Sequence, residues 1–210
     1  LVIRLLKDLF YVILIVNKII LILKIAYTRG TFMIDSDLVI FEIFPWNKNF
    51  NTGIEVIDEQ HKKLVNILNK LAVHLANRSG DIELNYIFDE LDNYADYHFK
   101  IEEKIWSKNF KDDEWYIEHE KTHNSFIDEV VKIKNNDKDK PLDDVVYEIV
   151  SMLIKWLAYH ILDTDKRMAL AVLSMNTGML LEESKNISDE SMNGSIHIVI
   201  DTVLTMYDTL

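Results

Sequence analysis

The 210-residue chain contains no cysteine, which excludes disulfides, thiolate metal sites, iron–sulfur clusters and thiol catalysis. It has only two prolines and five glycines, so long helices are favoured over a loop-rich or all-β fold. Acidic residues outnumber basic residues, 35 to 23. The net charge of −12 argues against binding to nucleic acid or to an anionic membrane surface. Any metal must therefore be held by His, Asp or Glu, and the lack of thiols fits a cytoplasmic protein.

A long uncharged apolar run is missing as well. Residues 1–27 are rich in Leu, Ile and Val, but their longest uncharged apolar run, residues 9–16, is far shorter than the roughly 20 residues of a spanning helix. A membrane anchor is therefore not expected. We expect residues 1–32 to be an apolar N-terminal extension that is not native, with Met33 as the natural start and residues 33–56 as an N-terminal arm.

Apolar residues recur at helical spacing in four segments, which begin near Asp58, Leu84, Trp115 and Val145. Short polar stretches separate the segments, including one with Gly80 and one that ends at Pro141. Four amphipathic helices with short links predict an all-α fold. We expect an antiparallel up-down four-helix bundle over residues 57–175, with extra N-terminal and C-terminal segments.

The C-terminal tail, residues 176–210, ends in apolar residues spaced by four, three, four and three: Ile196, Ile200, Val203, Tyr207 and Leu210. This heptad spacing is typical of a coiled-coil seam, which would support a homodimer or a signalling helix. A short amphipathic helix folded back onto the bundle fits the same spacing equally well.

Seven ionisable side chains fall on the stripes that face the bundle interior, where an unpaired charge is costly. They come from all four helices: His61, His98, Glu102, His119, His123, His160 and Asp165. Pairs spaced by four residues project from one helix face, whereas His160 and Asp165 converge only if their helical turn loosens. Five imidazoles and two carboxylates match what two divalent cations require, and the ligands alone leave iron, zinc and manganese open.

The order of these residues resembles the complete ligand pattern of the hemerythrin family. The similar segments are HFKIE at 98–102, HEKTH at 119–123 and HILDTD at 160–165, together with Gln60-His61 and Trp156-Leu157. The resemblance runs from about Phe44 to Met175.

The resemblance implies two iron ions bridged by oxide or hydroxide, with O2 as the ligand. His119, His123 and His160 would hold one iron, and His61 and His98 the other. Glu102 and Asp165 would bridge the two irons, and O2 would bind at the open position of the second. Apolar residues match positions that line the family's oxygen pocket: Leu64, Phe99, Trp156, Leu157 and Ile161.

We therefore expect a non-enzymatic protein that binds O2 reversibly as a carrier, a store or the input domain of an oxygen sensor. The heptad tail favours a sensor joined to a signalling domain. The alternative is a di-iron enzyme that acts on nitric oxide or peroxide, or an iron–sulfur repair protein. Repair proteins of this kind usually carry a cysteine-containing segment, which is absent here.

Three further residues lie near this pattern without belonging to it. His74 is off the apolar stripe of its helix and His197 is in the tail, so we expect both at the surface. Met168 follows Asp165 by one turn, where some family members carry an aromatic residue. The surroundings of the centre are thus expected to differ in detail.

Overall fold

The computed structural model describes residues 42, 44, 46, 48–77, 81–135 and 140–192. Within these residues every regular element is a helix, as the composition predicts. In chain order the elements are η1 (Lys48–Phe50), α2 (Glu55–Asn77), α3 (Asp81–Phe110), α4 (Glu114–Asn135), α5 (Leu142–Tyr159), η2 (His160–Asp165), α6 (Lys166–Met175) and α7 (Leu181–Met192).

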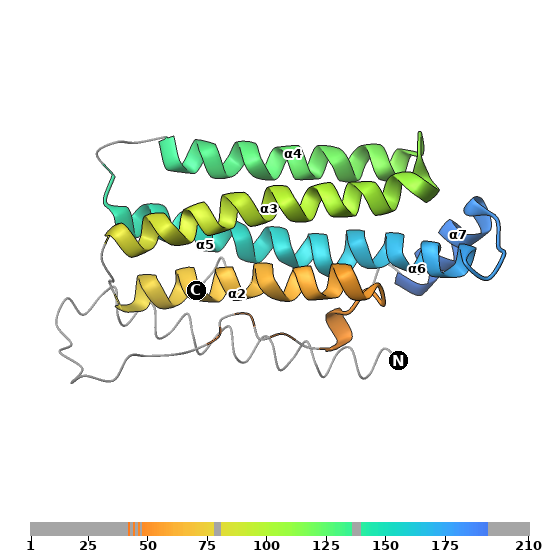
Figure 1. Ribbon diagram of the computed structural model, residues 1–210, viewed down its shortest axis with the longest axis horizontal. Helices are drawn as coiled ribbons and strands as arrows, with labels where there is room; N and C mark the ends of the chain where they lie inside the picture. Colours follow the sequence, from red (N-terminus) through yellow and green to blue (C-terminus); the bar gives the residue numbers. More distant parts are fainter. Residues whose placement is uncertain are drawn as a thin grey trace.

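Helices α2, α3, α4 and α5 lie side by side and alternate in direction (Figure 1). α2 packs against α3 and α5, and α4 packs against the same two helices from the other side. The all-α class and the antiparallel four-helix bundle are confirmed.

The main core fills the bundle with hydrocarbon. Its innermost side chains include Leu68, Leu71, Leu91, Ile149 and Leu153, which are at most 1% exposed. A second apolar cluster lies around α6 and brings together Ile57, Trp106, Phe110, Met168, Ala169, Ala171 and Val172. Met168 therefore packs in this second cluster.

α5, η2 and α6 follow one another without a break. The helical stretch Asp144–Met175 is long and apolar enough to span a membrane by length and composition. It is also the core helix of the bundle, with 56% of its most apolar window buried. Its apolar character is explained by this packing, as for a helix that is covered by its neighbours on several sides.

The segment before α2 is tied to the bundle by side chains of α2. The side-chain amide of Asn69 forms two hydrogen bonds with the backbone of Phe44: it accepts from the N–H at 3.0 Å and donates to the carbonyl at 3.1 Å. Asp58 accepts hydrogen bonds from the backbone N–H and the hydroxyl of Thr52, at 2.6 and 2.8 Å. These contacts place the Trp46 ring 6.5 Å from the ring of His61.

After α6 the chain reverses at Gly178, whose φ of 98° lies in the left-handed region that favours glycine. α7 then packs along α6. Helical spacing of apolar residues does not mark α7, since its buried side chains include Ser184, Lys185 and Ser188 beside Met192. The heptad residues and His197 lie outside the described residues, so the coiled-coil and fold-back alternatives both stay predictions.

Candidate metal centre

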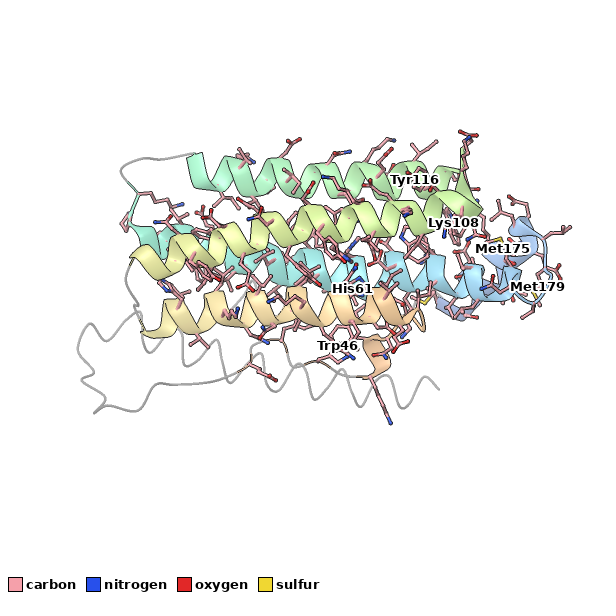
Figure 2. The ribbon with its side chains drawn as sticks, viewed as in Figure 1. Trp46, His61, Lys108, Tyr116, Met175 and Met179 are labelled. Carbon is pink, nitrogen blue, oxygen red and sulfur yellow. The ribbon has the colours of Figure 1, made fainter. Side chains whose placement is uncertain are left out.

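Seven polar side chains meet inside the bundle. Each of α2, α3 and α4 contributes at least one, and so does the continuous helix formed by α5 and η2 (Figure 2 labels His61). All seven are at most 2% exposed. They are the predicted donors, which come from α2 (His61), α3 (His98, Glu102), α4 (His119, His123) and η2 (His160, Asp165). The structure therefore brings the whole predicted set into one dry cage.

The Glu102 carboxylate lies at the centre of this cage. Its Oε1 is 3.3 Å from the Nε2 of His61. Its Oε2 lies 3.4 Å from the Nε2 atoms of both His123 and His160, and 3.6 Å from those of His98 and His119. All five imidazoles thus turn the same nitrogen toward one carboxylate.

Asp165 supplies the second carboxylate and faces three of the same rings. Its Oδ1 is 2.7 Å from the Nε2 of His119. Its Oδ2 is 3.1 Å from the Nε2 of His61 and 3.3 Å from that of His160. Both carboxylates therefore reach His61 on one side and the rings of His119 and His160 on the other, as a bridging ligand must.

A π-helical turn, η2, makes this convergence possible. In an α-helix two residues five apart point about 140° away from each other. The wider π-turn from His160 to Asp165 reduces that angle, so both side chains enter the cage. The five-residue spacing between His160 and Asp165 requires a loosened helical turn, and η2 is that turn. The helix then continues as α6.

Two imidazoles are oriented by partners outside the cage. The Nδ1 of His98 lies 3.0 Å from the Oε1 of Gln60, and the Nδ1 of His123 lies 3.1 Å from a carboxylate oxygen of Glu103. Each acceptor fixes the proton on Nδ1 and leaves the lone pair of Nε2 for a metal. The sequence analysis did not assign these roles to Gln60 and Glu103. The sequence gives one indication of them, because each residue is next to a candidate ligand in the chain.

The electrostatics of the cage favour bound cations. Burial lowers the pKa of His98 to about 3 and that of His160 to about 4, so both rings are neutral donors. Burial and Glu102 oppose ionisation of Asp165, but His160, His119 and His61 hold its pKa below the usual range. Burial also opposes charge on His61, yet the two carboxylates raise its pKa to about 9.

Several of these inward atoms have no hydrogen-bond partner among the described residues. They include both carboxylate oxygens of Glu102, the Oδ2 of Asp165 and the Nε2 atoms of His61 and His98. Buried polar atoms without partners are costly, and here they are Lewis bases that point at one another. The donors fall into two groups with ligand distances suited to metal ions, His61–His98–Glu102–His160 and Glu102–His119–His123–His160. The residues therefore fit a two-metal centre.

Apolar and aromatic side chains surround this cage. Phe99 stacks on the ring of His123 with centroids 3.9 Å apart, and Trp156 lies 4.0 Å from the ring of His160. Leu64, Leu157 and Ile161, the other predicted pocket residues, are buried in the main core. Aliphatic and aromatic side chains thus surround the imidazoles.

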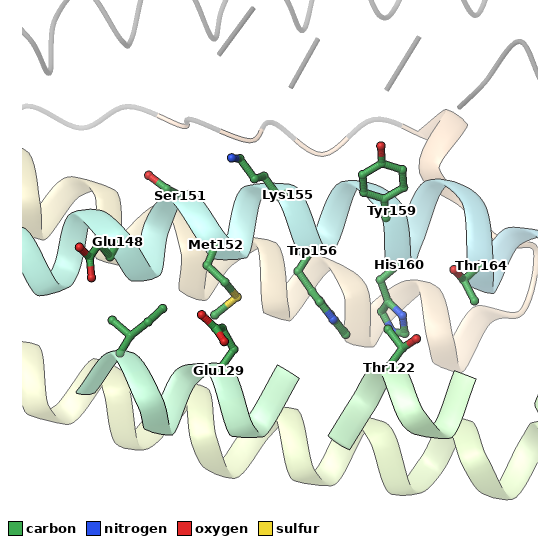
Figure 3. Close-up of a pocket in the computed structure, with 11 residues that line it drawn as sticks. Thr122, Glu129, Glu148, Ser151, Met152, Lys155, Trp156, Tyr159, His160 and Thr164 are labelled. Carbon is green, nitrogen blue, oxygen red and sulfur yellow. The ribbon is translucent and has the colours of Figure 1, made fainter. Parts of the chain in front are cut away.

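A surface groove of about 560 Å³ runs between α4 and α5 and reaches the edge of the cage (Figure 3). Its lining extends from Glu148 and Met152 past Trp156 to His160 and Thr164. Trp156 therefore separates the groove from the rings of His123 and Phe99, which lie 6.4 and 5.5 Å from its own ring.

The expectation for His74 is wrong. This side chain is only 4% exposed, because α2 is covered by α3 as well as by α5. Gln60, Ile67 and His74 recur every seventh residue, and all three are buried. Gln60 contacts His98 of α3, so this row forms a second buried face of α2. Two of its three residues are polar, and the spacing of apolar residues therefore does not reveal it.

Comparison with known proteins identifies related chains. The family model described as Hemerythrin HHE cation binding domain matches residues 52–171. A bacteriohemerythrin of Clostridium acetobutylicum is 32% identical over 128 residues, which cover 59% of this chain and 97% of the relative. A bacteriohemerythrin of Stenotrophomonas maltophilia is 30% identical over 125 residues, covering 59% and 78%. A hemerythrin-like protein of Naegleria gruberi is 30% identical over 125 residues, covering 59% and 89%. No solved structure matches.

Proposed function

Because this chain belongs to the hemerythrin family, we propose that it holds two iron ions in the buried cage and binds O2 there reversibly. One observation carries the proposal: five imidazole nitrogens and two ionised carboxylates, all buried, converge inside the bundle. The family supports iron, since the ligands themselves suit several metals.

The contacts support a division of the ligands between the two ions. His119, His123 and His160 would hold one iron, and His61 and His98 the other, with Glu102 and Asp165 shared. In support, the Nε2 atoms of His123 and His160 are only 3.3 Å apart, and His61 and His98 belong to one group of close donors while His119 and His123 belong to the other, with Glu102 and His160 common to both groups. The second iron then has one protein ligand fewer, which leaves a coordination position for O2.

When bound, the two irons would supply the electrons that hold O2. The chain's own residues favour binding over further reaction. Histidine-rich ligation donates less negative charge than a carboxylate-rich set, and so stabilises highly oxidised iron less well. The aromatic wall of Phe99 and Trp156 limits the access of water and external acids to the ligand. Both effects favour release of intact O2.

A binding module of this kind would serve as a carrier, a store or the input domain of a sensor, in the cytoplasm. A sensor needs an element that leaves the bundle, and α7 with the heptad segment after it could provide one. Association of the full chain that rises with protein concentration and depends on residues 196–210 would support the sensor. A tail that remains monomeric at all concentrations would support a carrier or store.

Metal analysis and optical spectra test the proposal. We expect two irons per chain, and an absorption band that forms when the reduced protein meets air and disappears when O2 is removed. His119→Ala should lower the iron content and abolish the band. Asn124→Ala is the matched control, because Asn124 is an exposed residue of the same helix that follows His123.

Two results would contradict the proposal. One is a protein that binds fewer than two irons after anaerobic loading. The other is steady turnover of nitric oxide with an electron donor, faster than autoxidation, which would support the enzyme alternative instead.

A further inference from the structure

The π-turn η2 carries a second acidic residue between its two candidate ligands. Asp163 lies between His160 and Asp165 in the chain, and it is 8% exposed. Its carboxylate pairs with Arg167 in the first turn of α6, with an N–O distance of 2.6 Å. A buried carboxylate requires such a partner, so Arg167 connects the π-turn to the helix that follows it.

Arg167 is in turn held by α7. Its guanidinium also pairs with Asp189 of α7. The hydroxyl of Ser188, a buried residue of α7, donates to the backbone carbonyl of Arg167 at 2.6 Å. The guanidinium carbon lies 5.9 Å from the ring of Trp115 at the start of α4. One side chain thus contacts the π-turn, α7 and α4.

α7 has a second anchor one helical turn before Ser188 and Asp189. Lys185 donates to Asp113, in the turn between α3 and α4, at 2.8 Å. Its ammonium group lies 5.1 Å from the Trp115 ring. α7 is therefore fixed between α6 and the start of α4, the helix that carries His119 and His123.

We propose that Arg167 is a positioning residue for the metal centre, and that α7 holds Arg167 in place. This inference rests on the metal centre proposed above. It extends that centre beyond the family region, because α7 begins ten residues after the last matched residue, 171. The ligand geometry at His160 and Asp165 is thereby completed by a helix that the family match does not include.

The physical reason is the conformational cost of η2. π-helical turns are rare and persist where surrounding contacts hold them. Without the guanidinium, Asp163 loses this ion pair, and the turn can relax toward an α-helical register. That change rotates Asp165 relative to His160, so a bridging carboxylate moves away from the ions.

The test uses the full chain loaded with Co²⁺, whose visible spectrum reports coordination geometry. For Arg167→Gln we expect about tenfold faster loss of Co²⁺ to a chelator and an altered spectrum, as is typical when a residue that orients ligands is removed. Arg167→Lys should restore part of the retention, since an ammonium can still pair with Asp163. Asp189→Asn should act in the same direction with a smaller effect.

Lys100→Gln is the matched control. Lys100 forms a pair with Asp96 at the same four-residue spacing, lies between His98 and Glu102 in the chain, and is exposed to solvent. Its loss should leave the release rate and the spectrum unchanged. Circular dichroism and melting temperature show whether each variant is folded.

The outcomes are distinct. A folded Arg167→Gln protein with the wild-type release rate and spectrum would overturn the inference, as would an equal change in Lys100→Gln. If Arg167→Gln does not fold, Asp189→Asn decides, since it keeps the pair with Asp163 and removes only the ion pair between Arg167 and α7. A wild-type release rate and spectrum in that variant would then overturn the inference. A wild-type chain that binds no Co²⁺ would contradict the proposed function itself, and this inference with it.

Discussion

The apolar half of the bundle and the half that holds the cage use the same helices and the same spacing, yet burial has opposite consequences in them. Around Leu68 and Leu153 most buried side chains are hydrocarbon, with few polar residues such as Asn69 and His74 among them, so removal from water stabilises the fold. Around Glu102 and Asp165 the buried groups are ionised carboxylates and imidazoles, so removal from water opposes their charge, and contacts among them or with bound cations must offset that cost. Burial thus stabilises one half directly and the other only through such contacts.

The largest expected effect is in the apolar half. Leu153→Ala removes a side chain that is 1% exposed, and should lower the free energy of unfolding by about 2–5 kcal/mol. Because no donor is lost, the decrease should be the same in metal-free and metal-loaded protein. Denaturant titrations of both forms measure it, and a loss confined to one form would contradict the proposed separation.

The next effect should differ between the metal-free and metal-loaded forms. Burial opposes charge on Glu102, but the imidazoles that face it hold its pKa well below the usual range, so the folded state favours the ionised carboxylate. Glu102→Gln should therefore lower the free energy of unfolding of the metal-free protein by about 1–3 kcal/mol. In metal-loaded protein the decrease should be larger, because a shared ligand would be lost as well. The same titrations apply, with Leu153→Ala as the reference, and an equal decrease in both forms would contradict a role of Glu102 as a metal ligand.

A smaller effect tests the partners of the imidazoles. Glu103→Gln replaces a carboxylate acceptor on the Nδ1 of His123 by an amide, the group that His98 already has in Gln60. We expect about tenfold weaker binding of one of the two ions, about 1.4 kcal/mol. Competition with a chelator measures the two affinities separately. Equal weakening of both ions would argue against the proposed division of ligands.

The smallest effect concerns the surface of the apolar half. The ammonium groups of Lys63 and Lys70 on α2 pair with Glu90 on α3 and hold its pKa below the ordinary value. A lowered pKa contributes stability that is present above the unfolded-state pKa and is lost as pH falls through the folded-state pKa. Glu90→Gln should therefore cost less than about 1 kcal/mol at neutral pH. The difference should vanish in acid, and unfolding curves at several pH values would show whether it persists there.

Much of the fold and the centre could be predicted because their residues obey helical spacing. The apolar rows mark the four helices, and the interval between His160 and Asp165 indicates a loosened turn. α7 could not be predicted in this way, because Lys185 and Ser188 are buried by specific partners far away in the chain. The burial of His74 was missed for a related reason, since a polar residue on a second inward face looks like a surface residue.

The π-turn also has a consequence for the long helix as a whole. From Leu153 to Ala169 a completely buried residue recurs at every fourth position: Leu153, Leu157, Ile161, Asp165 and Ala169. In an uninterrupted α-helix such a row drifts by about 40° at each step, and would wind off the interface within a few turns. The extra residue in η2 compensates for most of this drift. A one-residue deletion at this turn would put the downstream row out of phase and direct α6 away from the bundle.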